Sequence, residues 1–114
     1  MIKDLTGAPE MKNTIRQKEI IRGKILYYLS LVYPHPTSLS MLQGELDIFG
    51  YPVPMDELNF HIAYLAEKGF VAVERRRGPS GRQEVTLVTI TARGIDYRDG
   101  RLPADEGIYL EPQS

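Results

Sequence analysis

The chain has 114 residues, of which 42% are hydrophobic and 25% charged, and its formal net charge is −1. This length indicates one domain with a single core, and the composition is ordinary for a globular protein. The absence of cysteine excludes disulfide bonds and thiolate metal ligands. No stretch has the apolar content of a signal peptide or a membrane span, so we expect a cytoplasmic protein.

The charges are unevenly distributed along the chain. Residues 12–24 hold five lysines and arginines against one glutamate, a balance of +4. Residues 74–82 hold four arginines against one glutamate, a balance of +3, whereas residues 99–111 have a balance of −3. The near-neutral average therefore hides two basic segments and an acidic C-terminal segment.

The first third of the sequence predicts a flexible N-terminal arm and a long helix. Residues 1–12 contain glycine, proline and few apolar side chains, which is typical of a loose arm. From Asn13 or Thr14, either of which can cap a helix, to Val32 the apolar residues recur at helical spacing. The segment "YPHPT" ends this helix, because each proline disfavours helical backbone at the residue before it.

Two shorter helices are predicted next. The second spans about residues 38–46, with Thr37 or Ser38 as its cap. The third spans about residues 54–68, with Pro54 at the first helical position and Gly69 ending the helix. On the third helix Leu58, Ile62 and Leu65 fall on one side, at helical spacing, and form the expected buried stripe. The first basic segment places Lys18 and Arg22 one turn apart, where they could support a nucleic-acid backbone or form an ordinary solvated face.

The remainder predicts a hairpin, a short helix and an extended tail. "FVAVERR" and "QEVTLVTIT" are rich in β-branched residues and are separated by "GPSG", which fits a type I turn. "TARGIDYRDG" predicts a short helix capped by Thr91, in which Gly94 permits close packing. We expect residues 100–114 to be an extended C-terminal tail. The fold class is mainly α with a small antiparallel β-hairpin, and residues 13–99 form a winged helix-turn-helix domain.

The arginines of the hairpin are the first candidate nucleic-acid site. Their guanidinium groups present donor forks that suit phosphate oxygens, and a projecting hairpin can reach a DNA backbone or minor groove. The alternative is a solvated turn whose charges keep an edge strand from pairing with other molecules. The candidate residues are Arg75, Arg76, Arg77 and Arg82.

The outward face of the third helix is less suited to reading DNA. Direct readout uses mainly Arg, Lys, Asn and Gln, and only Asn59 belongs to that group, while Asp56 and Glu67 share the charge of phosphate. Phe60 and Tyr64, at i and i+4, favour a hydrophobic patch for a protein partner. The tail of the same chain could instead cover these two rings.

The residues show no pattern of an enzyme. His35 and His61 lack a neighbouring ligand at metal-binding spacing. There is no nucleophile elbow and no glycine-rich phosphate loop. We expect no catalytic residues, no metal and no cofactor.

Two stretches carry a family resemblance over about residues 38–108. "YLAEKGFV" and "ITARGIDYRDG" resemble the reading helix, first wing strand and following segment of winged-helix regulators such as the arsenic-repressor and multidrug-resistance-repressor types. "GIDYRDGRLPADEGI" resembles more narrowly the regulator-like winged-helix proteins of Mu-like bacteriophages and prophages. The resemblance implies DNA binding by the wing arginines and by Asn59, Phe60, Ala63 and Tyr64.

Two functions follow as hypotheses. The first is a DNA-binding transcriptional regulator of the phage or prophage type, which binds double-stranded DNA mainly through the arginine-rich wing. The alternative is an adaptor that binds a phage or host protein through Phe60 and Tyr64, without direct DNA readout. Winged-helix regulators that read palindromes are usually dimers, so a homodimer is a further expected partner state.

Overall fold

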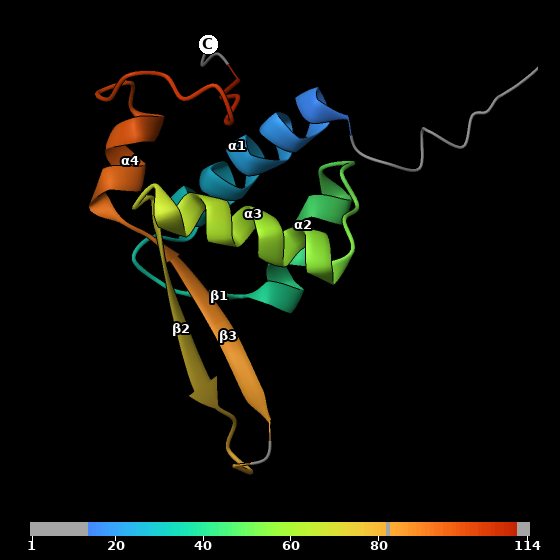
Figure 1. The fold of residues 1–114 in the computed structure, drawn as a ribbon. Coiled ribbons are helices and arrows are strands. Elements are labelled where there is room, and N and C mark those ends of the chain that lie inside the picture. The colour runs from blue at the N-terminus through green and yellow to red at the C-terminus, as the bar shows by residue number, and fades with distance from the viewer. Residues whose placement is uncertain (1–13, 82, 112–114) are drawn as a thin grey trace, which may run out of the picture.

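The computed structural model describes residues 14–81 and 83–111. The N-terminal arm expected at residues 1–12, and Arg82 of the wing, lie outside this range. Within these residues, four helices and three strands follow one another in the order α1 (Ile15–Val32), β1 (Thr37–Ser38), α2 (Leu39–Ile48), α3 (Met55–Glu67), β2 (Val71–Arg77), β3 (Glu84–Ile90) and α4 (Ala92–Arg98). Figure 1 shows the helices gathered into one body from which the β2–β3 hairpin projects. None of the described helices combines the length and apolarity that a membrane span requires.

The helix ends follow the local chemistry of the sequence. Thr14 forms a capping box with Gln17, Ser38 accepts a hydrogen bond from the Met41 amide, and Thr91 accepts one from the Gly94 amide. α3 differs slightly from its prediction, because Pro54 lies in extended backbone just before the helix and is not its first helical residue. Gly69, with a φ of 80°, ends α3 as predicted.

The hairpin belongs to a three-stranded antiparallel sheet with the order β1-β3-β2. β2 pairs with β3 from Val71 opposite Ile90 to Arg77 opposite Glu84, and β1 pairs with Val88 and Leu87 of β3. The sequence did not predict β1, since two residues are too few to show an alternating pattern. This strand ties the base of the wing to the start of α2.

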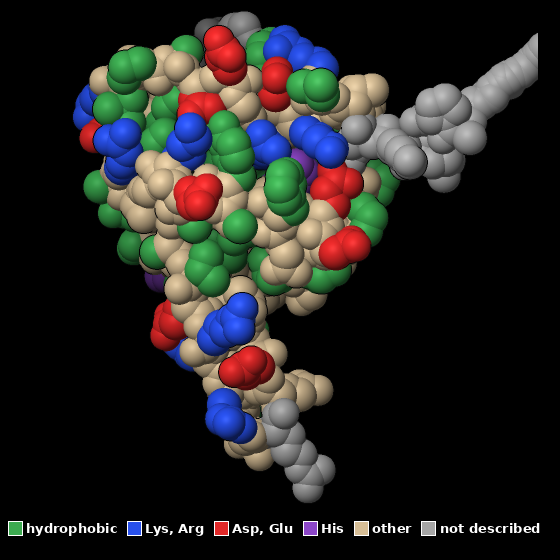
Figure 2. Space-filling model, viewed as in Figure 1, with side chains coloured by type: hydrophobic (Ala, Val, Ile, Leu, Met, Phe, Trp, Pro, Cys, Tyr) green, Lys and Arg blue, Asp and Glu red, His purple; other side chains and the backbone are tan. Residues whose placement is uncertain are grey.

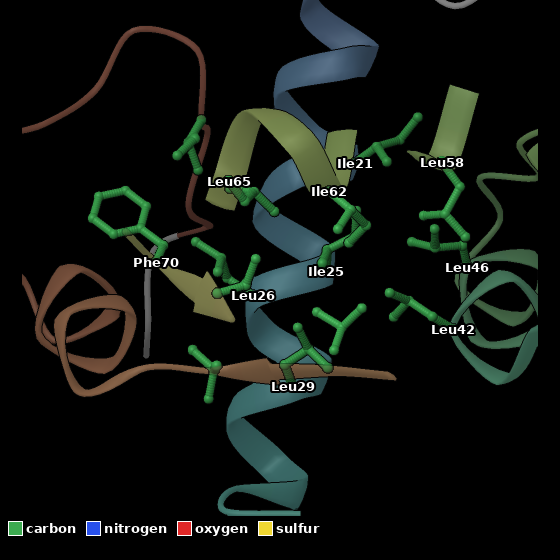
Figure 3. Close-up of a cluster of buried hydrophobic side chains, with 14 of the residues drawn as sticks. Ile21, Ile25, Leu26, Leu29, Leu42, Leu46, Leu58, Ile62, Leu65 and Phe70 are labelled. Atoms are coloured by element: carbon green, nitrogen blue, oxygen red, sulfur yellow. The ribbon is translucent and has the colours of Figure 1, made fainter. Parts of the chain in front are cut away.

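The core lies where α1, α2 and α3 meet the base of the sheet (Figure 3). Leu58, Ile62 and Leu65 are buried, which confirms the apolar stripe expected on α3. Gly94 also packs closely, because a Cβ atom there would lie 2.7 Å from Cγ1 of Ile90 and against the carbonyl of Phe70. The core therefore holds α3 with its opposite side outward.

The C-terminal segment packs on the helical body. Residues 101–111 contain no helix or strand, in line with the extended tail that was expected. Ile108 is buried, and the amide of Tyr109 donates a 3.0 Å hydrogen bond to the carbonyl of Glu19 on α1. The backbone crosses α1 so closely at Gly23 that a Cβ atom there would meet the Tyr109 carbonyl. The segment thus lies against α1 and α3.

Candidate nucleic-acid interface

The wing arginines point to both faces of the hairpin. Side chains alternate along a strand, so Arg75 and Arg77 share the face of Val71, while Arg76 lies on the other face with Glu74. Figure 2 shows acidic and basic side chains interspersed along the projecting hairpin. The three consecutive arginines therefore do not form one continuous patch.

Each described wing arginine has a different set of partners. Arg76 forms a two-point ion pair with Glu74, with Nε–Oε2 and Nη2–Oε1 distances of 2.9 and 3.2 Å, and this hydrogen-bonded carboxylate raises the pKa of Arg76. Arg77 donates through Nη1 to the carbonyl of Gly81 at 2.8 Å, across the turn. Arg75 is exposed and has no hydrogen bond or ion pair within residues 14–81 and 83–111. Among the wing arginines that the structure describes, Arg75 is therefore the one most available to an external phosphate.

The outward face of α3 carries mostly the side chains that its helical spacing predicts. Asn59, Phe60 and Ala63 are exposed, and the exposed fraction of Phe60 is 57%. Nδ2 of Asn59 donates one of its two hydrogens to the carbonyl of Met55 at 3.1 Å, which leaves the other hydrogen and the amide oxygen to bond a base. The acidic residues Asp56 and Glu67 are also exposed on this helix.

Tyr64 takes part in the contact between α3 and the C-terminal segment. Its hydroxyl donates a 2.7 Å hydrogen bond to Oδ1 of Asp105. Burial and this neighbouring carboxylate raise the pKa of Tyr64. The ring is close to two cations, with Cζ of Arg22 at 4.0 Å and Nζ of Lys68 at 5.3 Å from its centre. The tail thus covers Tyr64 in part and leaves Phe60 exposed.

Arg22 of α1 is buried, with only 8% of its surface exposed. It therefore does not belong to a solvated face, which was one of the two roles considered for the first basic segment. Its Nε donates to Nδ1 of His61 at 3.0 Å, and its Nη1 donates to the carbonyl of Gly107 at 3.0 Å. Since Nδ1 of His61 accepts, the ring proton is on Nε2, which donates to Glu57 at 3.0 Å. Burial is the main cause that lowers the pKa of His61, with the charge of Arg22 acting in the same direction.

Asp105 joins the C-terminal segment to the end of α3. Besides the Tyr64 hydroxyl, it accepts the amide of Gly107 at 2.8 Å and lies 2.8 Å from Nζ of Lys68. Burial by itself would raise the pKa of Asp105, but the hydrogen bonds from Lys68, Tyr64 and Gly107 lower it overall. Sequence reasoning missed this contact and that of Arg22, because the partners lie 41 and 85 residues apart and no local pattern links them.

A groove of about 680 Å³ runs between α1, α3 and the C-terminal segment. Its walls are the first turns of α1, the rings of Phe60 and Tyr64, Lys68, and residues 104–107. Both aromatic residues of the alternative protein-binding hypothesis therefore line one groove. No cluster of three His, Cys, Asp or Glu side chains suitable for a metal ion occurs in the described part of the chain.

In sequence, this chain is similar in part to a phage protein. No family model matches the sequence. The uncharacterized protein gp26 of Escherichia phage Mu is 40% identical over 62 residues, which cover 54% of this chain and 58% of gp26, so the match spans less than two thirds of that protein.

Solved structures of transcriptional regulators are similar to this chain over about two thirds of its length or more. The Thermoplasma acidophilum protein TA0346 is 26% identical with a TM-score of 0.55, covering 68% of this chain and 75% of that one. A PadR family regulator from Eggerthella lenta is 23% identical with a TM-score of 0.54, covering 68% and 67%. Bacillus subtilis PadR, solved with operator DNA, is 14% identical with a TM-score of 0.55, covering 80% and 54%. The chain has the winged-helix fold of these regulators.

Proposed function

We propose that this chain is a DNA-binding transcriptional regulator that holds duplex DNA mainly through its wing. The observation that carries the proposal is the exposed guanidinium of Arg75 on a hairpin that projects from a winged-helix body (Figure 1). An unpaired guanidinium can form a bidentate contact with a phosphate at little internal cost. The structure of Bacillus subtilis PadR with operator DNA supports the use of this fold for such binding.

Most of the affinity should come from phosphates. The outer face of α3 offers Asn59 as its one typical base-reading side chain, and Asp56 and Glu67 repel the backbone. A protein of this kind binds many duplex sequences and is sensitive to salt. The likeness to gp26, an uncharacterized protein of phage Mu, supports the phage or prophage type of this proposed regulator.

A salt series with a duplex of random sequence tests the proposal. The logarithm of the binding constant should fall linearly with the logarithm of the salt concentration, and Arg75→Ala should flatten this line by about one unit. Replacing Arg75, Arg76 and Arg77 together should flatten it by up to about three units. A chemically matched control is Arg101→Ala, because Arg101 follows α4 in the chain, lies outside the hairpin and pairs with Asp96. Equal slopes for the parent and the triple variant would show that the wing does not hold DNA.

A second candidate function is supported by Phe60. This large ring is more than half exposed and lines the groove between α1, α3 and the C-terminal segment. Such a ring beside a groove suits an apolar side chain of a protein partner or of a second copy. If the protein self-associates through it, Phe60→Ala should lower the mass measured by light scattering. An unchanged mass would exclude self-association through this ring.

A further inference from the structure

We propose that a row of cations, which runs from the start of α1 past the C-terminal end of α3 to α4, is a second phosphate-binding surface. The row consists of Lys18 and Arg22 of α1, Lys68 at the end of α3, and Arg93 of α4. Its expected occupant is the second backbone of a duplex whose first backbone contacts the wing. This inference rests on the proposed function.

The four cations are neighbours in the fold. Lys18 and Arg22 are one helical turn apart on α1. Arg22 and Lys68 both lie against the ring of Tyr64. Nε of Arg93 donates to the carbonyl of Lys68 at 3.1 Å. Figure 2 shows a row of basic side chains that crosses the upper part of the body.

Most of this positive charge has no internal counter-ion. Lys68 pairs with Asp105, but Lys18, Arg22 and Arg93 form no ion pair within the described ranges 14–81 and 83–111. Arg22 gives the strongest support for an external anion, because it is buried and its hydrogen-bond partners are a neutral imidazole and a backbone carbonyl. A buried cation without a carboxylate gains from an external anion placed beside it.

The location of the row fits a duplex docked on α3. A helix seated in the major groove, which is about 12 Å wide, has one phosphate backbone on each side. Figure 1 shows the hairpin on one side of α3 and the start of α1 with the C-terminal segment on the other. The wing and the α1 part of the cation row would therefore face the two backbones.

Carboxylates near the row weaken its attraction for phosphate. Glu19 pairs with Arg16, and Asp105 pairs with Lys68, so both are largely compensated. Glu106 lines the groove, is exposed, and has no ion pair among the described residues. Its charge opposes phosphate binding. Removing this charge should therefore have the opposite effect to removing a cation of the row.

The test compares four single variants that each change the charge by one. Lys18→Gln and Arg93→Gln should each flatten the salt dependence of duplex binding by about one unit, and Glu106→Gln should strengthen binding. Lys24→Gln is the matched control, because Lys24 is about 200° around α1 from Arg22 and pairs with Glu111. Thermal melting of each variant confirms that it is folded.

The outcomes separate this inference from the proposed function. If the parent binds duplex and Arg75→Ala flattens the slope while Lys18→Gln and Arg93→Gln do not, the wing claim stands and DNA does not use the row. A titration with inorganic phosphate then tests whether the row binds the phosphate of a free ligand instead of the phosphates of DNA. Saturable NMR shifts at Lys18 and Arg93 would assign the row to a free phosphorylated ligand, and their absence would overturn the inference. A parent that binds no duplex would overturn the proposed function itself.

Discussion

Nε of Arg22 donates a 3.0 Å hydrogen bond to Nδ1 of His61, which joins α1 to α3 inside the molecule. The same guanidinium donates to the carbonyl of Gly107, so one side chain links two helices to the C-terminal segment. His61 in turn donates to Glu57, which fixes the ring as the Nε2–H tautomer. The residue that sequence reasoning considered for DNA support is thus the centre of a buried polar network.

The first prediction concerns this network. Arg22→Met keeps the volume of the side chain but leaves Nδ1 of His61 and the carbonyl of Gly107 without a donor. One buried and one partly buried acceptor without partners should lower the free energy of unfolding by about 2–3 kcal/mol, measured by urea denaturation. Arg101→Met, which breaks an exposed ion pair, should cost less than about 1 kcal/mol. Similar midpoints for the two variants would show that the network contributes little.

The second prediction is a loss of stability in mild acid. The pKa of His61 is lower in the folded chain than its ordinary value of 6.5. As the pH falls below about 6.5 the unfolded chain takes up the proton first, so the free energy of unfolding falls with pH in this window. Well above pH 6.5 the imidazole is neutral in both states and the effect vanishes. His61→Gln should remove this component of the pH dependence in urea titrations between pH 7 and about 5. A parent whose stability is flat over that window would contradict the assignment.

The third prediction separates Asp105 from His61 by pH. The lowered pKa of Asp105 adds stability that is fully present above its ordinary value of 3.8 and is lost as the pH falls below it. Asp105→Asn removes this component and breaks the pair with Lys68. The C-terminal segment should then open more often, so the amide of Tyr109 should exchange its hydrogen faster than in the parent. An amide in the core of α1, such as that of Leu26, serves as the internal reference.

The sequence predicts the elements that depend on neighbouring residues. The caps at Thr14, Ser38 and Thr91, the end of α3 at Gly69, and the hairpin turn all depend on residues close in sequence. These local signals and the order of the elements predict the winged-helix fold, and the structure confirms it. β1 was missed because its pairing with β3 joins residues about 50 positions apart and its two residues carry no pattern of their own.

The candidate site is less accessible to sequence reasoning. Three consecutive arginines look like one cluster in the sequence, but strand alternation and the Glu74 ion pair divide them. That division could have been foreseen once Arg75–Arg77 were placed in a strand. The contacts of Arg22 and Asp105 could not, because they depend on the path of the C-terminal segment across α1 and α3. The DNA contacts of the wing and of α3 stay predictions.

The fourth prediction uses the ion pair on the wing. Glu74→Gln releases Arg76 from its two-point contact, so the freed guanidinium can bind a phosphate and one repelling charge is removed. Duplex binding should become tighter, and its salt dependence should steepen by up to about one unit. Glu111→Gln makes the same charge change beside Lys24 on α1 and should leave binding unchanged. Equal effects of the two variants would indicate a response to net charge alone.

The fifth prediction compares two glycines inside helices. A Cβ atom at Gly44 of α2 meets nothing within 4 Å, so Gly44→Ala should raise the free energy of unfolding by about 0.5–1 kcal/mol through the lower entropy of the unfolded chain. At Gly94 the same methyl group would lie 2.7 Å from Cγ1 of Ile90 and against the carbonyl of Phe70. Gly94→Ala should therefore cost about 1–3 kcal/mol, because α4 must move away from the sheet. Urea denaturation of both variants checks the opposite signs. A stabilising Gly94→Ala would mean that α4 packs less closely on β3 than the structure indicates.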